Sequence, residues 1–444
     1  MKRAKKLIKK VLPSAMVRGL MPAFHTAQAM FYNFVFLFPA KKLKVIAVTG
    51  TNGKTTTVSY IAAILQEAGF KVGVSTTSYA QIGEKIYHNK ENRTVADPIK
   101  MFWLLRRMRW RRVDWVILEV TSHSLDQNRL RGVPIYAAVM TNLTQDHIDY
   151  HKTMDNYAAA KAKLFKKDAK FTVLNADDEW HDYYDEIPVE QKMSYGTNPK
   201  AAAHLTNITL TPRYSKFTLT LDHTVKLDFK TSLIGKFNVF NAAAAATITY
   251  MLYVDKAAIL RGIRNMSTVA GRMEPIEADI PYNLIIDFAH TPDGLENVLE
   301  TLKSMTKQRL IVVFGGIGNR NDGERQMMGE IAAKHADRII LTDDELYDKS
   351  AAWLRKDVMK GIAKGNGSGK TTEVDGRRNG IKKALDIARK GDTVVITGMG
   401  DYDFMTVKGE YIPWNDKQVT LELLAEKGRL DAELAKKAKE EPKK

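Results

Sequence analysis

Short apolar runs alternate with segments of helical periodicity along most of the chain. The run KVIAVT (44–49) predicts a buried strand, and residues 56–68 then repeat apolar side chains at helical spacing before Gly69, which favours a helix ending there. Three further apolar runs predict strands of the same kind, at 113–120, 136–141 and 171–175. Strands that alternate with helices predict an α/β fold with a mostly parallel, doubly wound sheet.

The pattern changes in the middle of the chain. Residues 203–229 show short runs with a period of two, which predict an antiparallel hairpin, and 241–252 predict an alanine-rich helix. A second alternating series begins near Tyr282 and predicts a separate Rossmann-like α/β domain. We therefore expect three parts: a basic helical extension (1–43), a central domain (44–268) and a C-terminal domain (269–444).

Composition is that of a soluble globular protein and excludes several kinds of chemistry. Hydrophobic residues make up 44% of the 444 residues and charged residues 27%, so the chain is neither disordered nor fibrous. It has no cysteine, which excludes disulfides, thiolate zinc sites and a cysteine nucleophile. No apolar run approaches the roughly 20 residues of a membrane-spanning helix. We therefore expect a cytoplasmic protein.

Positive charge is concentrated at the N-terminus. The formal net charge is +17, and residues 1–44 contain no acid. That segment holds ten basic residues: Lys2, Arg3, Lys5, Lys6, Lys9, Lys10, Arg18, Lys41, Lys42 and Lys44. Leu7, Ile8, Val11 and Leu12 recur among them at helical spacing, which predicts a basic amphipathic helix. Such a helix can make a peripheral contact with the inner face of a membrane or pack on the protein body, and both interpretations stay open.

A glycine-rich loop stands between the first predicted strand and the first predicted helix. Its residues are Gly50, Thr51, Asn52, Gly53, Lys54, Thr55 and Thr56. Glycines let backbone N–H groups approach a phosphate closely, and the helix N-terminus adds positive potential. Lys54 would neutralise nucleotide phosphates, and the Thr55 hydroxyl would ligate Mg²⁺. Val48 stands where the usual phosphate loop has its first glycine, but strand, loop and helix follow in the order that the mechanism needs.

A second glycine-rich string, GNGSGKTT (365–372), lacks that setting. A predicted helix (354–362) precedes it and an extended run follows it, so no helix N-terminus points at a phosphate. We expect an exposed loop there and no nucleotide.

Acidic and histidine side chains gather after two of the predicted strands. Glu119 ends the second strand of the series, and a run with Asp146, His147, Asp149 and His151 follows the third. Ligands of parallel sheets collect beyond the carboxyl ends of the strands, and residues four apart share a helix face. The arrangement favours metal binding over a merely solvated loop.

Long motifs throughout the chain point to one family. They are VTGTNGKTTT, EVTSHSLDQNRL, TNLTQDHIDYH, YAAAKAKLF, GKFNVFNAAAA, GRMEPI and IIDFAHTPDGLENVL. With these motifs in family order from about 45 to 419, the chain resembles the Mur ligase family of ATP-dependent amide synthetases. The resemblance is greatest to the branch that adds the third peptide residue, and it implies a central ATP-binding domain and a C-terminal ligase domain.

The resemblance also implies a reaction. A carboxylate of a UDP-MurNAc-dipeptide attacks the γ-phosphate of ATP to give an acyl phosphate, and the amine of a free amino acid then displaces phosphate. The implied cofactors are ATP and two Mg²⁺, with Thr55 and Glu119 holding one ion and His147 and Glu119 the other. Lys161 matches a lysine that the family carbamylates into a metal ligand. Lys54, Glu119, His147 and Lys161 are thus the catalytic candidates.

Further residues match binding positions of the family. Asn238 and Asn241 match its adenine-side asparagines, while Arg272 and Asp287 match groups that meet the ATP phosphate and ribose. Four residues match contacts to the muramoyl-peptide substrate: Thr76, Thr77, Ser122 and Arg129. We expect a monomer in peptidoglycan precursor synthesis, with no nucleic-acid partner.

Three departures from the family pattern bear on the substrates. The family usually has an N-terminal domain of about a hundred residues that binds UDP, whereas about 44 residues precede the first strand here. The family's D-N-P-R reads DELY at 344–347, and its G-K-G-H-E reads GMGDY at 398–402. The acidic candidates for the amino-acid pocket are therefore Asp343, Asp344, Glu345 and Asp401. They favour a basic amino acid such as lysine.

Other functions remain open on sequence alone. A related ligase could act on a poly-γ-glutamate or folate-like acceptor, and a pseudo-ligase would bind nucleotide without turnover. A P-loop ATPase could instead bind nucleic acid or membrane through residues 100–112, which hold six Lys or Arg among aromatics. We favour an amphipathic helix with buried aromatics for that stretch.

Overall fold

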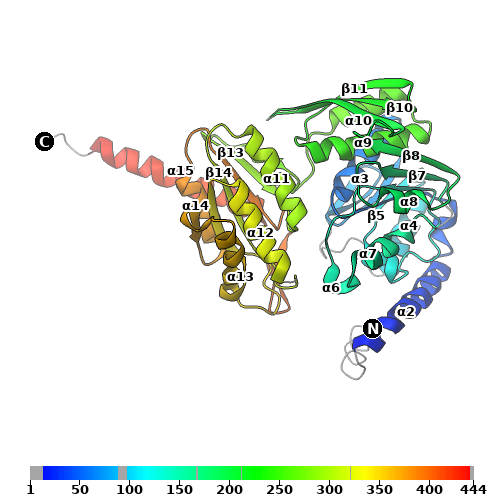
Figure 1. The fold of residues 1–444 in the computed structure, drawn as a ribbon, viewed down its shortest axis with the longest axis horizontal. Coiled ribbons are helices and arrows are strands. Elements are labelled where there is room, and N and C mark those ends of the chain that lie inside the picture. The colour runs from blue at the N-terminus through cyan, green and yellow to red at the C-terminus, as the bar shows by residue number, and fades with distance from the viewer. Residues whose placement is uncertain (1–13, 89–97, 167–168, 212, 321, 441–444) are drawn as a thin grey trace. The chain divides into compact units, whose positions relative to one another are not determined.

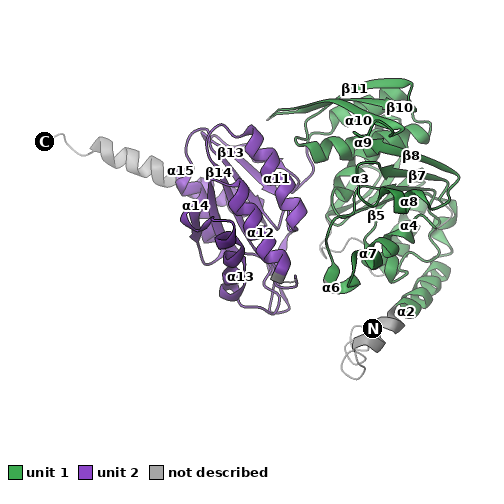
Figure 2. Cartoon of the chain, viewed as in Figure 1, with its two compact units in different colours: residues 1–267 green, residues 268–444 purple. Residues whose placement is uncertain are grey.

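The computed structural model describes residues 14–88, 98–166, 169–211, 213–320 and 322–440. The chain divides into two compact units, residues 1–267 and 268–444 (Figure 2). The amphipathic helix expected around Leu7–Leu12 lies outside the described residues. No described helix is long and apolar enough to span a membrane.

Unit 1 is built on an 11-stranded sheet with β1 (Lys44–Thr49) near its middle. Its order is β11-β10-β9-β8-β7-β6-β1-β5-β2-β3-β4. The neighbours of β1 are β5 (Trp115–Glu119) and β6 (Ala137–Met140), both parallel to it. The remaining strands are β2 (Val72–Ser75), β3 (Tyr79–Ile82), β4 (Lys85–His88), β7 (Phe171–Asn175), β8 (Gln191–Gly196), β9 (Ala203–Leu210), β10 (Ser215–Leu221) and β11 (Val225–Thr231). The predicted doubly wound α/β fold is confirmed.

The antiparallel region is larger than the predicted hairpin. Strands β9, β10 and β11 form a three-stranded meander, and β9 pairs in parallel with β8, so the meander extends the same sheet. Alternation marks each strand, because one face packs inward while the other meets solvent. This alternation does not reveal that β9 pairs with β8.

Helices precede, connect and follow the strands of unit 1 along the chain (Figure 1). They are α2 (Ser14–Val35), the 3₁₀ turn η1 (Pro39–Lys42), α3 (Lys54–Glu67), α4 (Pro98–Trp110), α5 (Ser122–Asp126), α6 (Ile148–His151), α7 (Met154–Ala162), α8 (His181–Asp185), α9 (Lys236–Met251) and α10 (Lys256–Asn265). The expectation of buried aromatics in 100–112 is wrong in part. Phe102 is buried with Met101, Leu105 and Met108, but Trp103 and Trp110 lie off that stripe and are exposed.

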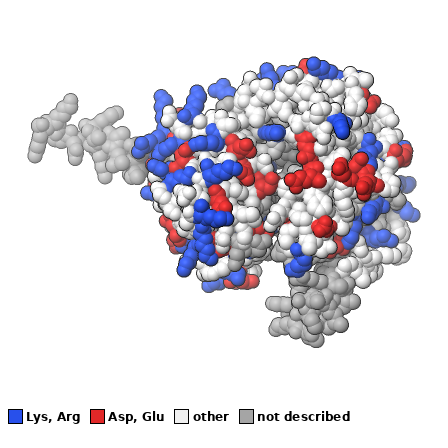
Figure 3. Space-filling model, viewed as in Figure 1, with Lys and Arg blue, Asp and Glu red and all other residues white. Residues whose placement is uncertain are grey.

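Unit 2 has a six-stranded sheet in the order β12-β13-β17-β14-β15-β16, parallel except for β12. Its strands are β12 (Glu274–Pro275), β13 (Asn283–Asp287), β14 (Leu310–Gly316), β15 (Arg338–Asp343), β16 (Thr371–Glu373) and β17 (Thr393–Thr397), with a hairpin of β18 (Phe404–Val407) and β19 (Glu410–Pro413). Its helices are α11 (Pro292–Met305), α12 (Asp322–His335), α13 (Ala351–Lys364), the 3₁₀ turn η2 (Ser368–Lys370), α14 (Arg377–Ile387) and α15 (Asp416–Glu440). Basic and acidic side chains are interspersed on the face drawn in Figure 3.

Candidate active site

The glycine-rich loop joins β1 to the start of α3 and lies tightly against its neighbours. Gly50 has φ +149°, and a Cβ there would lie 1.8 Å from the Thr141 Oγ1 atom. Gly53 has φ +81°, and its Cβ would lie 2.1 Å from Oδ1 of Asn241. Glycine is therefore required at both positions, for backbone conformation and for space.

Two residues after β6 hold the loop in place. The Asn142 Oδ1 atom accepts a 2.9 Å hydrogen bond from the N–H of Asn52, and its Nδ2 donates to the Asn52 carbonyl at 3.2 Å. Thr141 Oγ1 also donates to that carbonyl, at 2.6 Å. The sequence pattern does not single out either residue, although their place directly after a strand next to β1 is a usable signal.

Thr55 and Glu119 meet at the carboxyl end of the sheet. The Thr55 hydroxyl, in the first turn of α3, donates to Glu119 Oε2 at 2.8 Å. Thr77 donates to the same carboxylate through its N–H at 3.0 Å and through its hydroxyl at 2.9 Å. Glu119 is only 3% exposed, so this arrangement orients a buried negative charge beside the loop.

Lys161 faces the loop from α7. Its Nζ atom donates to the Gly50 carbonyl at 2.7 Å and lies 4.6 Å from the Tyr157 ring centre. Lys54 donates to the Thr51 carbonyl at 2.5 Å. Lys161 is 1% exposed, and burial, followed by the charge of Lys54, holds the pKa of Lys161 well below its usual value.

His147 lies beside the same helix. It precedes α6 in a left-handed conformation (φ 55°), and its Nε2 is 3.4 Å from Asp146 Oδ2. Its ring centre is 6.3 Å from that of Tyr157 and 4.6 Å from that of His123. His147 and Lys161 thus both lie near the Tyr157 ring.

The aspartate and histidine run does not form a ligand cluster. Within the described part of the chain, no three or more His, Asp or Glu side chains converge as a metal site would need. His151 Nε2 instead pairs with Ser122 Oγ at 2.9 Å, and the Asp149 side chain lies outside the described residues. Thr55 and Glu119 do offer the hydroxyl and carboxylate oxygens that suit Mg²⁺, with nucleotide oxygens and water as further ligands.

The predicted adenine-side residues lie on α9. The Asn238 Nδ2 atom donates to the Ile234 carbonyl at 2.8 Å, and Asn241 Nδ2 donates to Asn238 Oδ1 at 3.2 Å. Thr57 of α3 donates to Asn241 Oδ1 at 3.3 Å. These amides therefore connect α9 to the helix that begins with the phosphate loop.

The other predicted substrate residues of unit 1 make local contacts. Thr76 Oγ1 donates to the Tyr79 carbonyl at 2.9 Å and shapes the turn after β2. The Arg129 guanidinium donates twice to Gln127 Oε1, at 3.1 and 2.7 Å. Both residues follow strands that lead to the same sheet edge as Glu119.

In unit 2, Asp287 ends β13 and accepts hydrogen bonds from two backbone N–H groups. Those of Met273 and Ala289 both donate at 2.7 Å, and burial raises the pKa of Asp287. The Arg272 guanidinium stacks 4.2 Å from the ring centre of Phe288. The hydrogen bond from Met273 to Asp287 thus joins the bend at 271–273 to the end of β13.

The acidic candidates for the amino-acid pocket have partners within unit 2. Asp343 pairs with Arg355, and Asp344 with the buried Arg377 at 3.2 Å. Burial raises the pKa of Asp344 to about 7. Glu345 accepts from the Thr406 hydroxyl at 2.8 Å. Carboxylates with such partners are a weaker basis for selecting a lysine side chain than the sequence suggests. Asp401 follows Gly400, whose backbone approaches Gly271.

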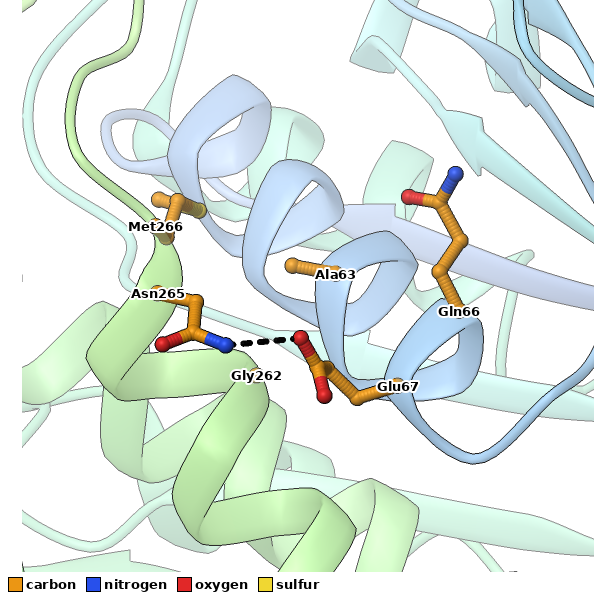
Figure 4. Close-up of a pocket in the computed structure, with 6 residues that line it drawn as sticks. All are labelled: Ala63, Gln66, Glu67, Gly262, Asn265 and Met266. Carbon is orange, nitrogen blue, oxygen red and sulfur yellow. Dashed lines mark hydrogen bonds between the residues drawn. The ribbon is translucent and has the colours of Figure 1, made fainter.

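Two other features lie away from the loop. The string at 365–372 stands after α13 and contains η2 before β16, as its flanking pattern predicts. A depression of about 420 Å³ lies between α3 and α10, where Asn265 donates to Glu67 at 2.8 Å (Figure 4). Glu67 ends α3 whereas the loop precedes it, so the length of a 14-residue helix separates the two.

Comparison with known proteins agrees with the fold and the loop. The Mur ligase middle domain model matches residues 48–249, and the Mur ligase glutamate ligase domain model matches 271–400. UDP-N-acetylmuramoyl-L-alanyl-D-glutamate–2,6-diaminopimelate ligases are similar in sequence. That of Syntrophomonas wolfei is 37% identical over 87% of this chain and 79% of its own, and that of Aquifex aeolicus is 38% identical over 88% and 79%.

Solved structures agree in fold. A UDP-N-acetylmuramoyl-L-alanyl-D-glutamate–2,6-diaminopimelate ligase has a TM-score of 0.63 at 29% identity, covering 92% of this chain and 83% of its own. The Mycobacterium tuberculosis folylpolyglutamate synthase has 0.68 at 16% identity (84% and 92%), which shows the shared fold alone. The phosphate loop and two α/β units define an ATP-dependent amide ligase. The chain belongs to the Mur ligase family, whose members use ATP and Mg²⁺.

Proposed function

We propose that the chain joins an amino acid to a UDP-MurNAc-dipeptide through an acyl phosphate, in peptidoglycan precursor synthesis. The names of relatives at 37–38% identity support this acceptor, and they carry more weight than the folate-type enzyme at 16%. The hydrogen bond between Thr55 and Glu119 beside a phosphate loop is the observation on which the chemistry rests.

The phosphate loop and the residues predicted to surround the nucleotide have distinct roles in this scheme. The N–H groups of the loop and the Lys54 ammonium neutralise the β- and γ-phosphates of ATP. Thr55 and Glu119 would hold one Mg²⁺, and His147 together with Glu119 would help to hold the second. Bound Mg²⁺ supplies charge neutralisation, so that an anionic carboxylate can approach an anionic phosphoryl group. By the family resemblance, Asn238 and Asn241 would contact the adenine, and Arg272 and Asp287 would meet the ATP phosphate and ribose.

Carbamylation of Lys161 belongs to the same proposal. A carbamate forms when a neutral amine attacks CO₂ and releases a proton, so it requires an unprotonated lysine. Burial and the adjacent Lys54 favour the neutral amine at Lys161. The product carries a negative charge instead of a positive one, which turns repulsion of Mg²⁺ into attraction.

The incoming amino acid is proposed to be a diamino acid. Lysine and diaminopimelate both carry a distal ammonium, and the relatives are named for diaminopimelate. Tyr347 stands at the arginine of the family's D-N-P-R. Glu345 and Asp401 remain the candidates for the ammonium, because Asp344 is already paired with Arg377. Thr76, Thr77, Ser122 and Arg129 are proposed to contact the muramoyl-dipeptide.

A single assay tests the function. The full chain is incubated with ATP, Mg²⁺ and UDP-MurNAc-L-Ala-D-Glu, and phosphate release is measured with diaminopimelate, lysine, ornithine and alanine separately. The proposal requires release that depends on both the acceptor and a diamino acid, with a ligated product of matching mass. Release with a folate or poly-γ-glutamate acceptor, and none with the muramoyl dipeptide, would overturn it.

A further inference from the structure

Large apolar side chains are exposed along the second half of α2 and the turn after it. Met30, Phe31, Phe34 and Leu37 are 59%, 61%, 64% and 62% exposed. Single exposed apolar residues are normal on a soluble protein, but a run of this density indicates an interaction surface.

The turn that ends this run is held in an unusual conformation. Leu37 and Phe38 are both left-handed, with φ of 57° and 51°, which side chains with a Cβ rarely adopt. Arg109 of α4 donates to both of their carbonyls, at 3.1 and 3.3 Å. The fold therefore stabilises a strained turn that leaves Leu37 in solvent.

A second row of apolar side chains lies on α4. Ile99, Trp103 and Trp110 are 40%, 48% and 74% exposed, and they recur at helical spacing on the side opposite the buried stripe. The Arg107 guanidinium stacks 4.6 Å from the Trp103 ring centre. Because α2 packs on α4 and Arg109 joins α4 to the turn, the two rows lie on neighbouring helices of unit 1. We call these two rows the α2–α4 face.

The segments that form this surface contain basic residues and no acid. The first acidic residue of the chain is Glu67, and none occurs in 98–113. Lys41, Lys42, Arg111 and Arg112 are exposed. Lys41 Nζ lies 5.0 Å from the Phe38 ring centre, and the Arg111 guanidinium lies 5.3 Å from that of Trp110. Two copies of the chain meeting through this face would oppose like charges, which disfavours a symmetric dimer.

We propose that the α2–α4 face docks on an anionic lipid bilayer. Exposed Trp, Phe and Leu side chains suit the boundary between headgroups and acyl chains, and Arg and Lys pair with lipid phosphates. This peripheral contact does not depend on the ligase chemistry. It would hold the enzyme at a membrane surface while its substrates stay in solution.

Vesicle flotation of the full chain tests the proposal. We expect binding to vesicles of phosphatidylglycerol and phosphatidylcholine, little binding to phosphatidylcholine alone, and release by salt. Phe34→Ser and Trp110→Ser should each lower the partition coefficient about tenfold or more. Tyr253→Ser is the matched control, because Tyr253 is 83% exposed on another turn and should bind as the unmodified chain does.

Two further measurements keep the test decisive. Acyl chains brominated near the headgroup should quench the fluorescence of the unmodified chain, and Trp110→Phe should remove part of that quenching. Phosphate release by every variant should equal that of the unmodified chain, which shows that the substitutions leave the fold intact. No binding to anionic vesicles would overturn the proposal. So would equal binding by the Phe34→Ser and Trp110→Ser variants, or a concentration-dependent dimer that Phe34→Ser abolishes without any effect of lipid.

Discussion

The Thr55 hydroxyl donates a 2.8 Å hydrogen bond to the Glu119 carboxylate and so joins the first turn of α3 to the end of β5. These are the two side chains that the mechanism assigns to Mg²⁺. Their contact depends on the parallel pairing of β1 and β5, which sets Val48 beside Glu119. Replacing Glu119 by an uncharged side chain of the same size therefore tests the role of its negative charge alone.

Glu119→Gln should lower ligase turnover at least about 100-fold, because the negative charge that holds the metal is lost. The amide oxygen can still accept the Thr77 N–H, and the amide nitrogen can donate to the Thr77 hydroxyl, so the thermal midpoint should change little. Phosphate release and thermal unfolding check the two parts separately. A variant with turnover near that of the unmodified chain would remove Glu119 from the metal site.

Lys54→Ala should also abolish turnover, by about 100-fold or more, because the ammonium neutralises transferring phosphate charge. The second glycine-rich string offers a matched control. Lys370 has the same sequence neighbours, but it donates to the Ala336 carbonyl and ends η2 rather than opening a long helix. Lys370→Ala should therefore leave phosphate release unchanged. Equal losses in the two variants would show that the flanking elements do not distinguish the loops.

Lys161→Met should inactivate the enzyme and yet stabilise the fold near neutral pH. The unfolded chain binds a proton at Lys161 up to about pH 10.5, whereas burial and the charge of Lys54 lower the pKa and make the same proton less favourable in the native state. The lysine thus destabilises the uncarbamylated protein there, and this penalty vanishes as the pH rises through the unfolded pKa. Denaturant unfolding at pH 7 and pH 10.5 measures the difference. A variant less stable than the unmodified chain at pH 7 would contradict it.

Carbamylation gives the same lysine a spectroscopic signature. With ¹³C-labelled bicarbonate, the unmodified chain should show a carbamate resonance that Lys161→Ala lacks. Short carboxylates should partly restore turnover to Lys161→Ala, because they supply the missing negative charge. Rescue without a carbamate signal would mean that the lysine acts in another way.

The sequence predicts the loop well because a strand, a glycine turn and a helix are local features. It predicts β1 and β7 with the bounds found, since buried parallel strands are continuous apolar runs. It does not reveal Asn142, whose partner Asn52 is 90 residues away. Pairings over such separations depend on strand order, and strand order is not written in periodicity.

Side-chain chemistry is harder to predict than the fold. Asp344 appears in the sequence as a free acid, yet Arg377 pairs with it across 33 residues. From the sequence, we expect the aromatic side chains of 100–112 to be buried. Phe102 is buried, but the periodicity of the helix puts Trp103 and Trp110 on the side opposite the buried stripe.

Gly53→Ala should weaken ATP binding strongly, and Gly69→Ala should not. Both glycines have positive φ, +81° and +85°, so both substitutions carry a similar backbone cost of about 1 kcal/mol. Only at Gly53 would the new Cβ collide with Asn241, whereas nothing lies within 4 Å of the Cβ at Gly69. Nucleotide titration of both variants isolates the collision from the backbone cost. Equal affinities would show that the loop can move away from α9.

Asp344 should make the stability of unit 2 decrease as the pH rises from about 4 to about 7. Burial raises the pKa of Asp344 from 3.8 to about 7, so between these values the native state holds a proton that the unfolded chain has released. The stabilisation is complete below the unfolded pKa and is lost as the pH rises through the folded one. Asp344→Asn cannot titrate and should flatten this part of the curve, whereas Asp375→Asn, at a position 86% exposed, should retain it. Urea unfolding at pH 4.5, 6 and 7.5 provides the measurement. An identical slope in the Asp344→Asn variant and the unmodified chain would show that Arg377 keeps the carboxylate ionised.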